Sequence, residues 1–249
     1  MFRKIFHMVG WLLLAIFLIV TLAFTSFETR DIKCVEINIL YDGDQVISID
    51  KNEVLKIVNS IDAKLLKKNL NQINAEAIEV AVEKHETIEN AEVYKMVTKD
   101  SGNFKGILAV KIKHREPLVR VITSNGSYYL DKDGEKFPVS TKYTANVLVA
   151  SGNISDKLVK DSLLSFIKYL EGNAFWKAQI EQIHVTEAGE ITMIPLVGDH
   201  FINLGALVDY REKLTNLKTF YEQVLAQGNW NIYKSISLKY KHQVIGTKR

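Results

Sequence analysis

The sequence has few of the residues that form disulfides, bind metals or attract polyanions. It contains one cysteine, Cys34, and three prolines among 249 residues, and its formal net charge is only +3. A single cysteine excludes an intramolecular disulfide and a zinc site built from cysteines. Because phosphate binding needs a basic face and the charges here are dispersed, we expect no nucleic-acid partner. We interpret Cys34 as a small packed side chain of a strand.

The motifs of common enzyme classes are missing as well. The sequence has no phosphate-binding glycine loop, no dinucleotide-binding Gly-x-Gly-x-x-Gly and no Gly-x-Ser-x-Gly elbow. His85-Glu86 resembles the start of a zinc-protease helix, but Glu89 occupies the position of the second histidine. His184 and His200 lie in or beside predicted strands, and nothing in the sequence pairs them with a carboxylate. We interpret His85-Glu86 as part of a surface helix, and His184 and His200 as ordinary strand or turn histidines.

One acidic segment resembles the start of a calcium-binding loop. Asp131 and Asp133 fit that start, but Gly134 comes too early and no glutamate follows at the closing distance. We therefore predict a hairpin turn at this point. Without a nucleophile, base and orienting group, or a set of metal ligands, the sequence predicts no enzyme, no cofactor, no metal site and no small-molecule substrate.

The longest apolar run lies near the N-terminus, from Met8 to Phe27, and carries no charge. At about 1.5 Å per residue, a helix of this length spans roughly 30 Å, the thickness of the hydrocarbon core of a bilayer. The alternative is a cleavable signal peptide, whose apolar region is typically about 7–15 residues long. Because this run is longer and does not end in a small-x-small pair, we favour a retained transmembrane anchor.

The charges beside this run predict its orientation. Arg3 and Lys4 precede it, whereas the charges that follow it largely cancel. The positive-inside rule then places residues 1–7 in the cytoplasm and the folded part of the chain on the other side. Since no second run of comparable length occurs, we expect a single crossing by residues 8–27.

The first part of the folded region follows the pattern strand, helix, helix, strand, strand. Val35, Ile37 and Ile39 alternate with polar residues, which indicates a half-buried strand. Asp50 and Glu53 have the spacing of a reciprocal N-terminal cap. The predicted elements are a strand over 35–39, helices over 50–61 and 75–85, and strands over 91–97 and 107–113. Helices that cover one face of such a sheet would bury both apolar surfaces.

The second part mixes strands with two amphipathic helices. Asn125-Gly126 is a hairpin signal, and Gly172 and Gly228 are predicted to end the helices. Residues 233–240 are expected to form the last long strand, and Val244-Ile245 can continue it. The predicted strands cover 118–123, 127–131, 147–150, 180–186, 190–196, 200–204 and 233–240, and the helices 156–171 and 209–227.

Three short motifs resemble the FtsQ/DivIB family of bacterial division proteins. Residues 111–118 resemble the strand ending in Glu-Arg-x-Pro that joins the family's two domains: Arg115 and Pro117 keep their spacing, and His114 replaces the acidic residue. Residues 129–137 resemble a strand that continues into Asp, polar residues and Gly. Residues 236–240, followed by Val244-Ile245, resemble the family's terminal Ile-Asp-Leu-Arg-Tyr strand.

The resemblance implies an α+β protein with two folded domains after the transmembrane helix. The first would be a POTRA-like βααββ domain over residues 33–114. The second, over residues 115–249, would be a mixed β domain with helices packed on an antiparallel sheet. Members of the family are not enzymes. The resemblance therefore implies a scaffold that links early and late proteins of the divisome in the inner membrane, with its folded domains in the periplasm at the division septum.

The family also implies partners and a binding site. FtsB-like and FtsL-like membrane division proteins are the expected partners, and an FtsB-like strand would add to the open edge of the last long strand. Lys239 replaces the family's arginine there, and lysine cannot make the same planar two-pronged contact with a carboxylate. The implied partner-binding residues are Ser235, Ile236, Ser237, Leu238, Lys239, Tyr240, Lys241 and Val244.

Two other classes of protein stay open at this stage. A POTRA-bearing subunit of an envelope transport or outer-membrane assembly system is one, although the many alternating strands of a following barrel are not visible in the sequence. An anchored envelope enzyme is the other, and it would require a deep pocket lined by clustered histidines or carboxylates. For the strand itself, the plain alternative is a solvated face protected by lysines.

Overall fold

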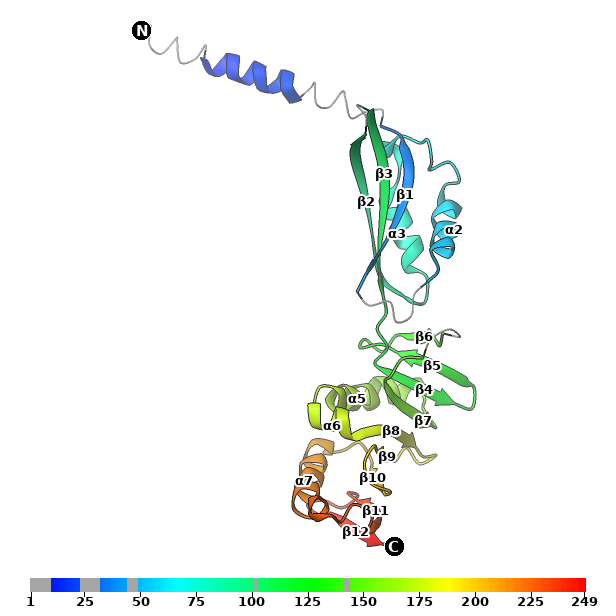
Figure 1. Cartoon of the computed structure of the whole chain (residues 1–249), viewed down its shortest axis with the longest axis vertical. Helices are drawn as coiled ribbons and strands as arrows, with labels where there is room; N and C mark the ends of the chain where they lie inside the picture. Colours follow the sequence, from blue (N-terminus) through cyan, green and yellow to red (C-terminus); the bar gives the residue numbers. More distant parts are fainter. Residues whose placement is uncertain (1–9, 23–31, 44–48, 101–102, 141–143) are drawn as a thin grey trace. The chain divides into compact units, whose positions relative to one another are not determined.

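The computed structural model describes residues 10–22, 32–43, 49–100, 103–140 and 144–249. The chain divides into two compact units, Met1–His114 and Arg115–Arg249 (Figure 1).

Residues 10–22 form a helix whose side chains are all exposed. This helix lies within the predicted transmembrane segment, but residues 8–9 and 23–27 of that segment, and the predicted cytoplasmic end, lie outside the described residues. Among the helices of the described ranges, none combines the length and the hydropathy needed to cross a membrane. The transmembrane anchor therefore stays a prediction.

The folded part of the first unit has the predicted order of elements. Its three-stranded sheet has the order β1-β3-β2, with β1 parallel and β2 antiparallel to the central strand β3. Two helices pack on this sheet (Figure 1). The elements are β1 (Cys34–Asp42), α2 (Lys51–Ile61), the short helix η1 (Leu70–Gln72), α3 (Ala75–Glu83), β2 (Ile88–Asp100) and β3 (Asn103–His114).

Local capping explains where the two helices of the first unit begin. The Asp50 carboxylate accepts a hydrogen bond from the Asn52 amide at 2.7 Å, and the Asn74 side chain accepts one from the Ala77 amide at 3.1 Å. Such caps satisfy amides that the first helical turn leaves free. The Glu53 carboxylate, which was predicted to complete the Asp50 cap, instead lies 3.5 Å from His85 Nε2.

Helix α3 also covers part of one edge of this sheet. The Glu79 carboxylate accepts a hydrogen bond from the Val93 amide at 2.7 Å, and the Glu83 carboxylate accepts one from the Ala91 amide at 3.1 Å. Both amides belong to β2, the strand at that edge. Unpaired edge amides are sites for the addition of another strand, so these two carboxylates close this portion of the edge.

The second unit is a nine-stranded sheet in the order β12-β11-β10-β9-β8-β7-β4-β5-β6. The strands are β4 (Val119–Thr123), β5 (Gly126–Leu130), β6 (Lys136–Pro138), β7 (Leu148–Gly152), β8 (Ile180–Val185), β9 (Ile191–Pro195), β10 (Phe201–Gly205), β11 (Tyr233–Ser237) and β12 (Ile245–Lys248). The helical segments are α4 (Asp156–Leu158), η2 (Val159–Leu163), α5 (Leu164–Glu171), α6 (Ala174–Gln179), α7 (Tyr210–Gln223) and η3 (Leu225–Gln227).

The prediction of an antiparallel sheet in the second unit is wrong, because this sheet is mixed. Strands β4, β7 and β8 run parallel to one another, and β10 runs parallel to β11. The other neighbouring pairs are antiparallel. Parallel neighbours need long crossover connections. Helical segments connect β7 to β8 and β10 to β11, whereas the connection from β4 to β7 contains β5 and β6. Helix α6, which begins at the Asn173 cap, was not predicted.

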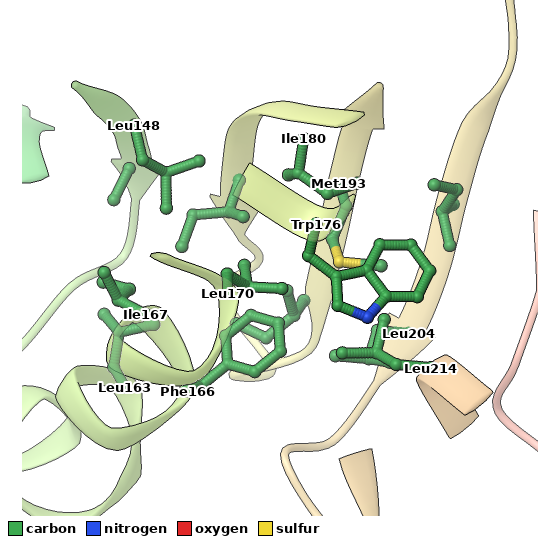
Figure 2. Close-up of a cluster of buried hydrophobic side chains, with 14 of the residues drawn as sticks. Leu148, Leu163, Phe166, Ile167, Leu170, Trp176, Ile180, Met193, Leu204 and Leu214 are labelled. Atoms are coloured by element: carbon green, nitrogen blue, oxygen red, sulfur yellow. The ribbon is translucent and has the colours of Figure 1, made fainter. Parts of the chain in front are cut away.

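The core of the second unit lies between the sheet and its helices (Figure 2). Helix α5 buries Phe166, Ile167 and Leu170, and α6 contributes Trp176. Met193 and Leu204 meet them from β9 and β10. Complete burial of one such side chain stabilises a fold by about 1.5–3 kcal/mol, which explains why the amphipathic helices of this unit were visible in the sequence.

Candidate protein-interaction site

The predicted partner strand does not lie at an edge. In β11, Ser235, Ile236 and Ser237 pair with β10 on one side and with β12 on the other. Ile236 is fully buried. The expectation that this strand presents an open edge is therefore wrong, because a further strand of the same chain already occupies that position.

The predicted strand over 233–240 ends early because the chain reverses after Ser237. Leu238 is buried and its amide donates to the Asn203 carbonyl at 2.8 Å. His242 then adopts a φ of 61°, which helps the chain turn without a glycine. Val244 packs against the core, half-buried. Residues 244–245 therefore do not extend the strand, and Ile245 begins β12, which runs antiparallel to β11.

The edge of the sheet beside β11 is β12, which the sequence did not reveal as a separate strand, and β6 forms the opposite edge. Strand β12 has β11 as its only neighbour in the sheet order. The Arg249 amide donates to the Ile232 carbonyl at 3.1 Å, which directs residue 249 toward β11. Since backbone groups alternate along an antiparallel pair, the N–H and C=O groups of Gly246 and Lys248 point away from β11. The signal that could have revealed β12 is weak, because no Gly or Pro marks the reversal.

An aromatic ring fixes β12 against β11. A Cβ atom placed on Gly246 would lie 2.5 Å from Cε1 of Tyr233, so the ring covers the position where a side chain would be. Tyr233 in turn packs edge-on against Phe220 of α7, with ring centroids 5.5 Å apart. Glycine at position 246 thus allows the close approach that holds the edge strand in register.

The reversal between β11 and β12 borders a hollow of about 310 Å³. Lys239, Tyr240 and Lys241 line it on one side, and residues around the start of α7 line it on the other. Tyr240 is 62% exposed, the largest exposure of an aromatic side chain among the described residues after that of Trp11 and Phe17. These three predicted residues therefore form a continuous surface next to the edge strand.

Three basic side chains around this hollow have contacts within the chain. Lys239 Nζ lies 2.6 Å from Glu190 Oε2, and His242 Nδ1 lies 2.6 Å from Glu212 Oε1. Lys213 Nζ donates to the Leu204 and Ala206 carbonyls, each at 3.0 Å. Loss of hydration lowers the pKa of Lys213, and nearby Asp209 partly opposes this effect. The surface thus presents the exposed Tyr240 beside basic side chains that already have contacts within the chain.

Two of the sequence motifs meet at the start of the second unit. Arg115 Nη1 donates to Asp131 Oδ2 at 2.6 Å, and the Asp131 side chain is only 5% exposed. Asp131 Oδ1 accepts from the amides of Asp133 and Glu135 at 2.8 and 2.9 Å. The predicted hairpin turn is confirmed, and the carboxylate that resembled a calcium ligand has a structural role.

The other histidines and the cysteine also have structural contacts. His200 Nε2 lies 3.0 Å from the Tyr221 hydroxyl, and His184 Nδ1 lies 3.0 Å from Ser151 Oγ. Cys34 is fully buried, and burial raises the pKa of its thiol, as expected for a packed side chain. A hydrolytic site around His184 would further need a group that orients the imidazole. Within the described ranges, no group of three or more His, Cys, Asp or Glu side chains is arranged to hold a metal ion.

Together the two units define a class of protein. The first is a small sheet of three strands with two helices in βααββ order, and the second is a larger mixed sheet whose terminal strand is an edge. This combination is that of an α+β protein with a POTRA-like domain followed by a sheet-rich C-terminal domain.

Comparison with known families agrees with this class. Residues 116–247, more than half of the chain, match the family model described as FtsQ/DivIB, C-terminal related. Residues 32–101 match the model described as POTRA-like domain. The chain therefore belongs to the FtsQ/DivIB family and carries the domains of a cell-division protein. No curated protein matches it.

Proposed function

We propose that this chain is a non-enzymatic scaffold of the bacterial divisome, held in the inner membrane by residues 8–27. Residues 1–7 would lie in the cytoplasm and both folded domains in the periplasm, with the protein gathered at the division septum. Support comes from the family, from the uncharged run of the sequence and from the exposed apolar helix over residues 10–22 within it. The scaffold would link early and late division proteins by binding FtsB-like and FtsL-like partners.

The proposed binding mode is addition of an FtsB-like strand to β12. The observation that carries this proposal is that β12 has a neighbour on one side only, with the backbone groups of Gly246 and Lys248 directed outward. A partner strand would satisfy those groups, and contacts to side chains would supply specificity. The binding site would then comprise β12 and the adjoining turn with Tyr240.

Lys239 would have a different role from the arginine that it replaces. Its ammonium group already lies 2.6 Å from the Glu190 carboxylate of the same chain. A lysine held in this way is a poor partner for a second carboxylate, because it lacks the planar fork of arginine. We expect Tyr240, rather than Lys239, to provide the main side-chain contact next to the partner strand.

Lys248→Pro tests the binding mode, with Lys248→Ala as the matched control. Proline removes the outward amide at position 248 but leaves the bonds to β11, since edge strands tolerate proline where the N–H faces solvent. Alanine removes the same side chain and keeps the amide. We expect the proline variant to bind an FtsB-like protein from the same cell roughly tenfold to hundredfold more weakly than the alanine variant.

Equal binding of both variants would reject strand addition at β12, even if the protein is a division scaffold. The cellular role is tested separately by the position of a fluorescent fusion. A band at mid-cell in dividing cells supports the scaffold. An even distribution around the cell would favour a POTRA-bearing transport or assembly subunit instead.

A further inference from the structure

One end of the POTRA-like domain carries exposed apolar and basic side chains that the proposed partner site does not use. This is the end at which the chain enters the domain, where Cys34 of β1 lies opposite Gly106 of β3. Because β1 and β3 are parallel, the residues of β3 that precede Gly106 extend beyond the start of β1. We call the following six residues the entry-end surface: Lys64, Leu66, Lys67, Val97, Lys99 and Phe104.

The tip of the β2–β3 hairpin supplies half of this surface. Val97 lies opposite Gly106, and Lys99 lies opposite Phe104, so Val97, Lys99 and Phe104 share one face of the sheet. Val97 and Phe104 are each 46% exposed. Lys99 Nζ lies 5.6 Å from the centroid of the Phe104 ring. The described tip therefore combines an aromatic ring with an ammonium group, about 7 Å beyond the start of β1 by strand geometry.

A rigid loop supplies the other half. The Lys67 amide donates to the Cys34 carbonyl at 2.7 Å, the Cys34 amide donates to the Lys68 carbonyl at 2.9 Å, and the Leu70 amide donates to the Ile32 carbonyl at 2.9 Å. These bonds fix the loop beside the first residues of β1. Lys67 is held at a φ of 82°, a costly conformation for a residue with a side chain. Leu66 is 51% exposed, and Lys64 and Lys67 are exposed as well.

The acidic group nearest to these lysines in the loop is already neutralised. Lys68 Nζ lies 2.5 Å from Asp62 Oδ2, and this hydrogen bond lowers the pKa of the Asp62 carboxyl. Glu36 of β1 pairs with Ile107, so its side chain is on the opposite face of the sheet from Gly106. The six residues of the entry-end surface therefore carry three ammonium groups and no carboxylate around an apolar centre.

The sequence limits how far this surface can lie from a membrane. The uncharged run ends at Phe27, and Ile32 is only five residues later. An extended chain of that length spans at most about 17 Å. If residues 8–27 cross the bilayer, as proposed above, the entry of the domain lies within that distance of the headgroup region. Apolar side chains with flanking lysines are the composition that binds an interface containing anionic lipids.

We propose that the entry-end surface docks on anionic lipid headgroups beside the transmembrane segment. Phe104 and Leu66 enter the interface, and Lys64, Lys67 and Lys99 bind the headgroups. This inference rests on the proposed membrane anchor. Docking would orient the POTRA-like domain on the bilayer instead of leaving it free on its linker.

The test uses the full chain in vesicles whose lipid headgroups carry a spin-label quencher. A nitrobenzoxadiazole fluorophore is attached to the cysteine of the variant Phe104→Cys, and Cys34→Ala removes the native thiol. The same fluorophore at Lys84→Cys reports on the opposite end of the domain, because α3 runs away from the entry end. Vesicles contain phosphatidylcholine alone or with phosphatidylglycerol. We expect quenching at position 104 only, stronger with phosphatidylglycerol and weakened by salt.

The charge requirement is tested by replacing Lys64, Lys67 and Lys99 with glutamine. Each replacement should lower the ratio of docked to undocked domain about fivefold. Replacing Lys157, Lys160 and Lys168, which are exposed on the second unit, is the matched control and should leave quenching unchanged. Equal quenching at positions 104 and 84 would overturn the proposal. Equal quenching of position 104 in both kinds of vesicle, or no quenching of it in either kind, would overturn it as well.

Flotation separates this result from a failure of the anchor. Full chain that floats with vesicles at high salt but shows no quenching at position 104 refutes the docking and leaves the anchor intact. Full chain that fails to float refutes the anchor itself, and the docking with it.

Discussion

The two sheets of this protein differ in what covers their edges. In the POTRA-like domain, the carboxylates of Glu79 and Glu83 accept hydrogen bonds from the β2 amides of Val93 and Ala91. At β12, the structure records no such side-chain partner for the outward amides of Gly246 and Lys248 within the described residues. The first sheet thus closes part of one edge with its own helix, whereas no such carboxylate cap lies on β12 among the described residues.

This difference shows that an edge strand alone does not define a binding site. Exposed edges invite unwanted pairing, so proteins usually cover or charge them. Carboxylate caps achieve this for β2 without an additional strand. Where a chain covers one edge and leaves another uncovered, the uncovered edge is the better candidate for strand addition. For this reason the proposed partner site lies in the second domain.

The largest effect is expected from removing both caps of β2. The double variant Glu79→Ala/Glu83→Ala leaves two partly buried amides without partners, and each such loss costs about 1–3 kcal/mol. We expect the free energy of unfolding of the first unit to fall by about 2–6 kcal/mol, and the variant to self-associate through β2. Chemical denaturation and sedimentation measure the two effects.

Glu76→Ala, a change at an exposed position of the same helix, is the control for the caps. If the double variant is as stable and as monomeric as this control, the carboxylates do not protect the edge and the contrast between the two sheets disappears.

A smaller loss should follow from displacing the open edge. Gly246→Val places a side chain where the Tyr233 ring lies, because a Cβ atom there is 2.5 Å from Cε1 of the ring. Overpacking of this kind costs about 1–3 kcal/mol, and the displaced β12 should no longer bind a partner strand. Thr247→Val, at the next and exposed position, should retain both stability and binding. Normal binding by Gly246→Val would show that the partner does not use β12.

Particular residues show how much of this fold the sequence could predict. Periodic apolar side chains, such as Val54 and Val58 in α2 or Phe166 and Leu170 in α5, predicted the helices because burial of one face determines that spacing. The order of strands and helices along the first unit followed from the same logic. Parallel pairing within the second sheet was not visible, since it depends on crossovers rather than on local pattern.

The predicted binding residues stay a prediction, and the structure corrects which strand forms the edge beside them. The segment around Lys239 and Tyr240 does adjoin the edge, yet the edge itself is β12. The reversal between the two strands uses His242 at positive φ, and turn prediction depends on Gly, Pro, Asn and Asp. A turn built from other residues gives no such signal, so 233–240 resembled one long strand.

Acid should weaken the first domain through His114. This side chain is buried and stacks on Tyr41 of β1, with ring centroids 5.4 Å apart. Burial lowers the pKa of His114 below its ordinary value, so the unfolded chain takes up a proton first as the pH falls. The contribution of neutral His114 to the free energy of unfolding is therefore fully present above the ordinary histidine pKa and decreases as the pH falls below it.

Hydrogen exchange of the β1 and β3 amides between pH 7 and pH 5, corrected for intrinsic rates, measures this loss. His114→Phe keeps the stacking and should reduce the pH dependence, whereas His242→Gln, at an exposed position, should not. An unchanged pH dependence in His114→Phe would assign the acid sensitivity to other groups.

The smallest effect is expected at Lys239. Its ion pair with Glu190 is exposed at both ends, with side-chain exposures of 42% and 40%. Exposed pairs contribute about 0–1 kcal/mol, so Lys239→Met should change the thermal unfolding midpoint very little. Partner binding should also persist, because Glu190 rather than the partner holds this lysine. A loss of binding comparable to that of Lys248→Pro would assign Lys239 to the interface after all.

Hydrogen–deuterium exchange of the full chain, with and without an FtsB-like partner, tests the central claim most directly. Addition of a strand to β12 predicts slower exchange of the Gly246 and Lys248 amides in the complex, with the amides of Ala91 and Val93 in β2 unchanged. Unchanged exchange at Gly246 and Lys248 in a complex that still forms, or new protection along β2 instead, would contradict the assignment of β12 as the binding edge.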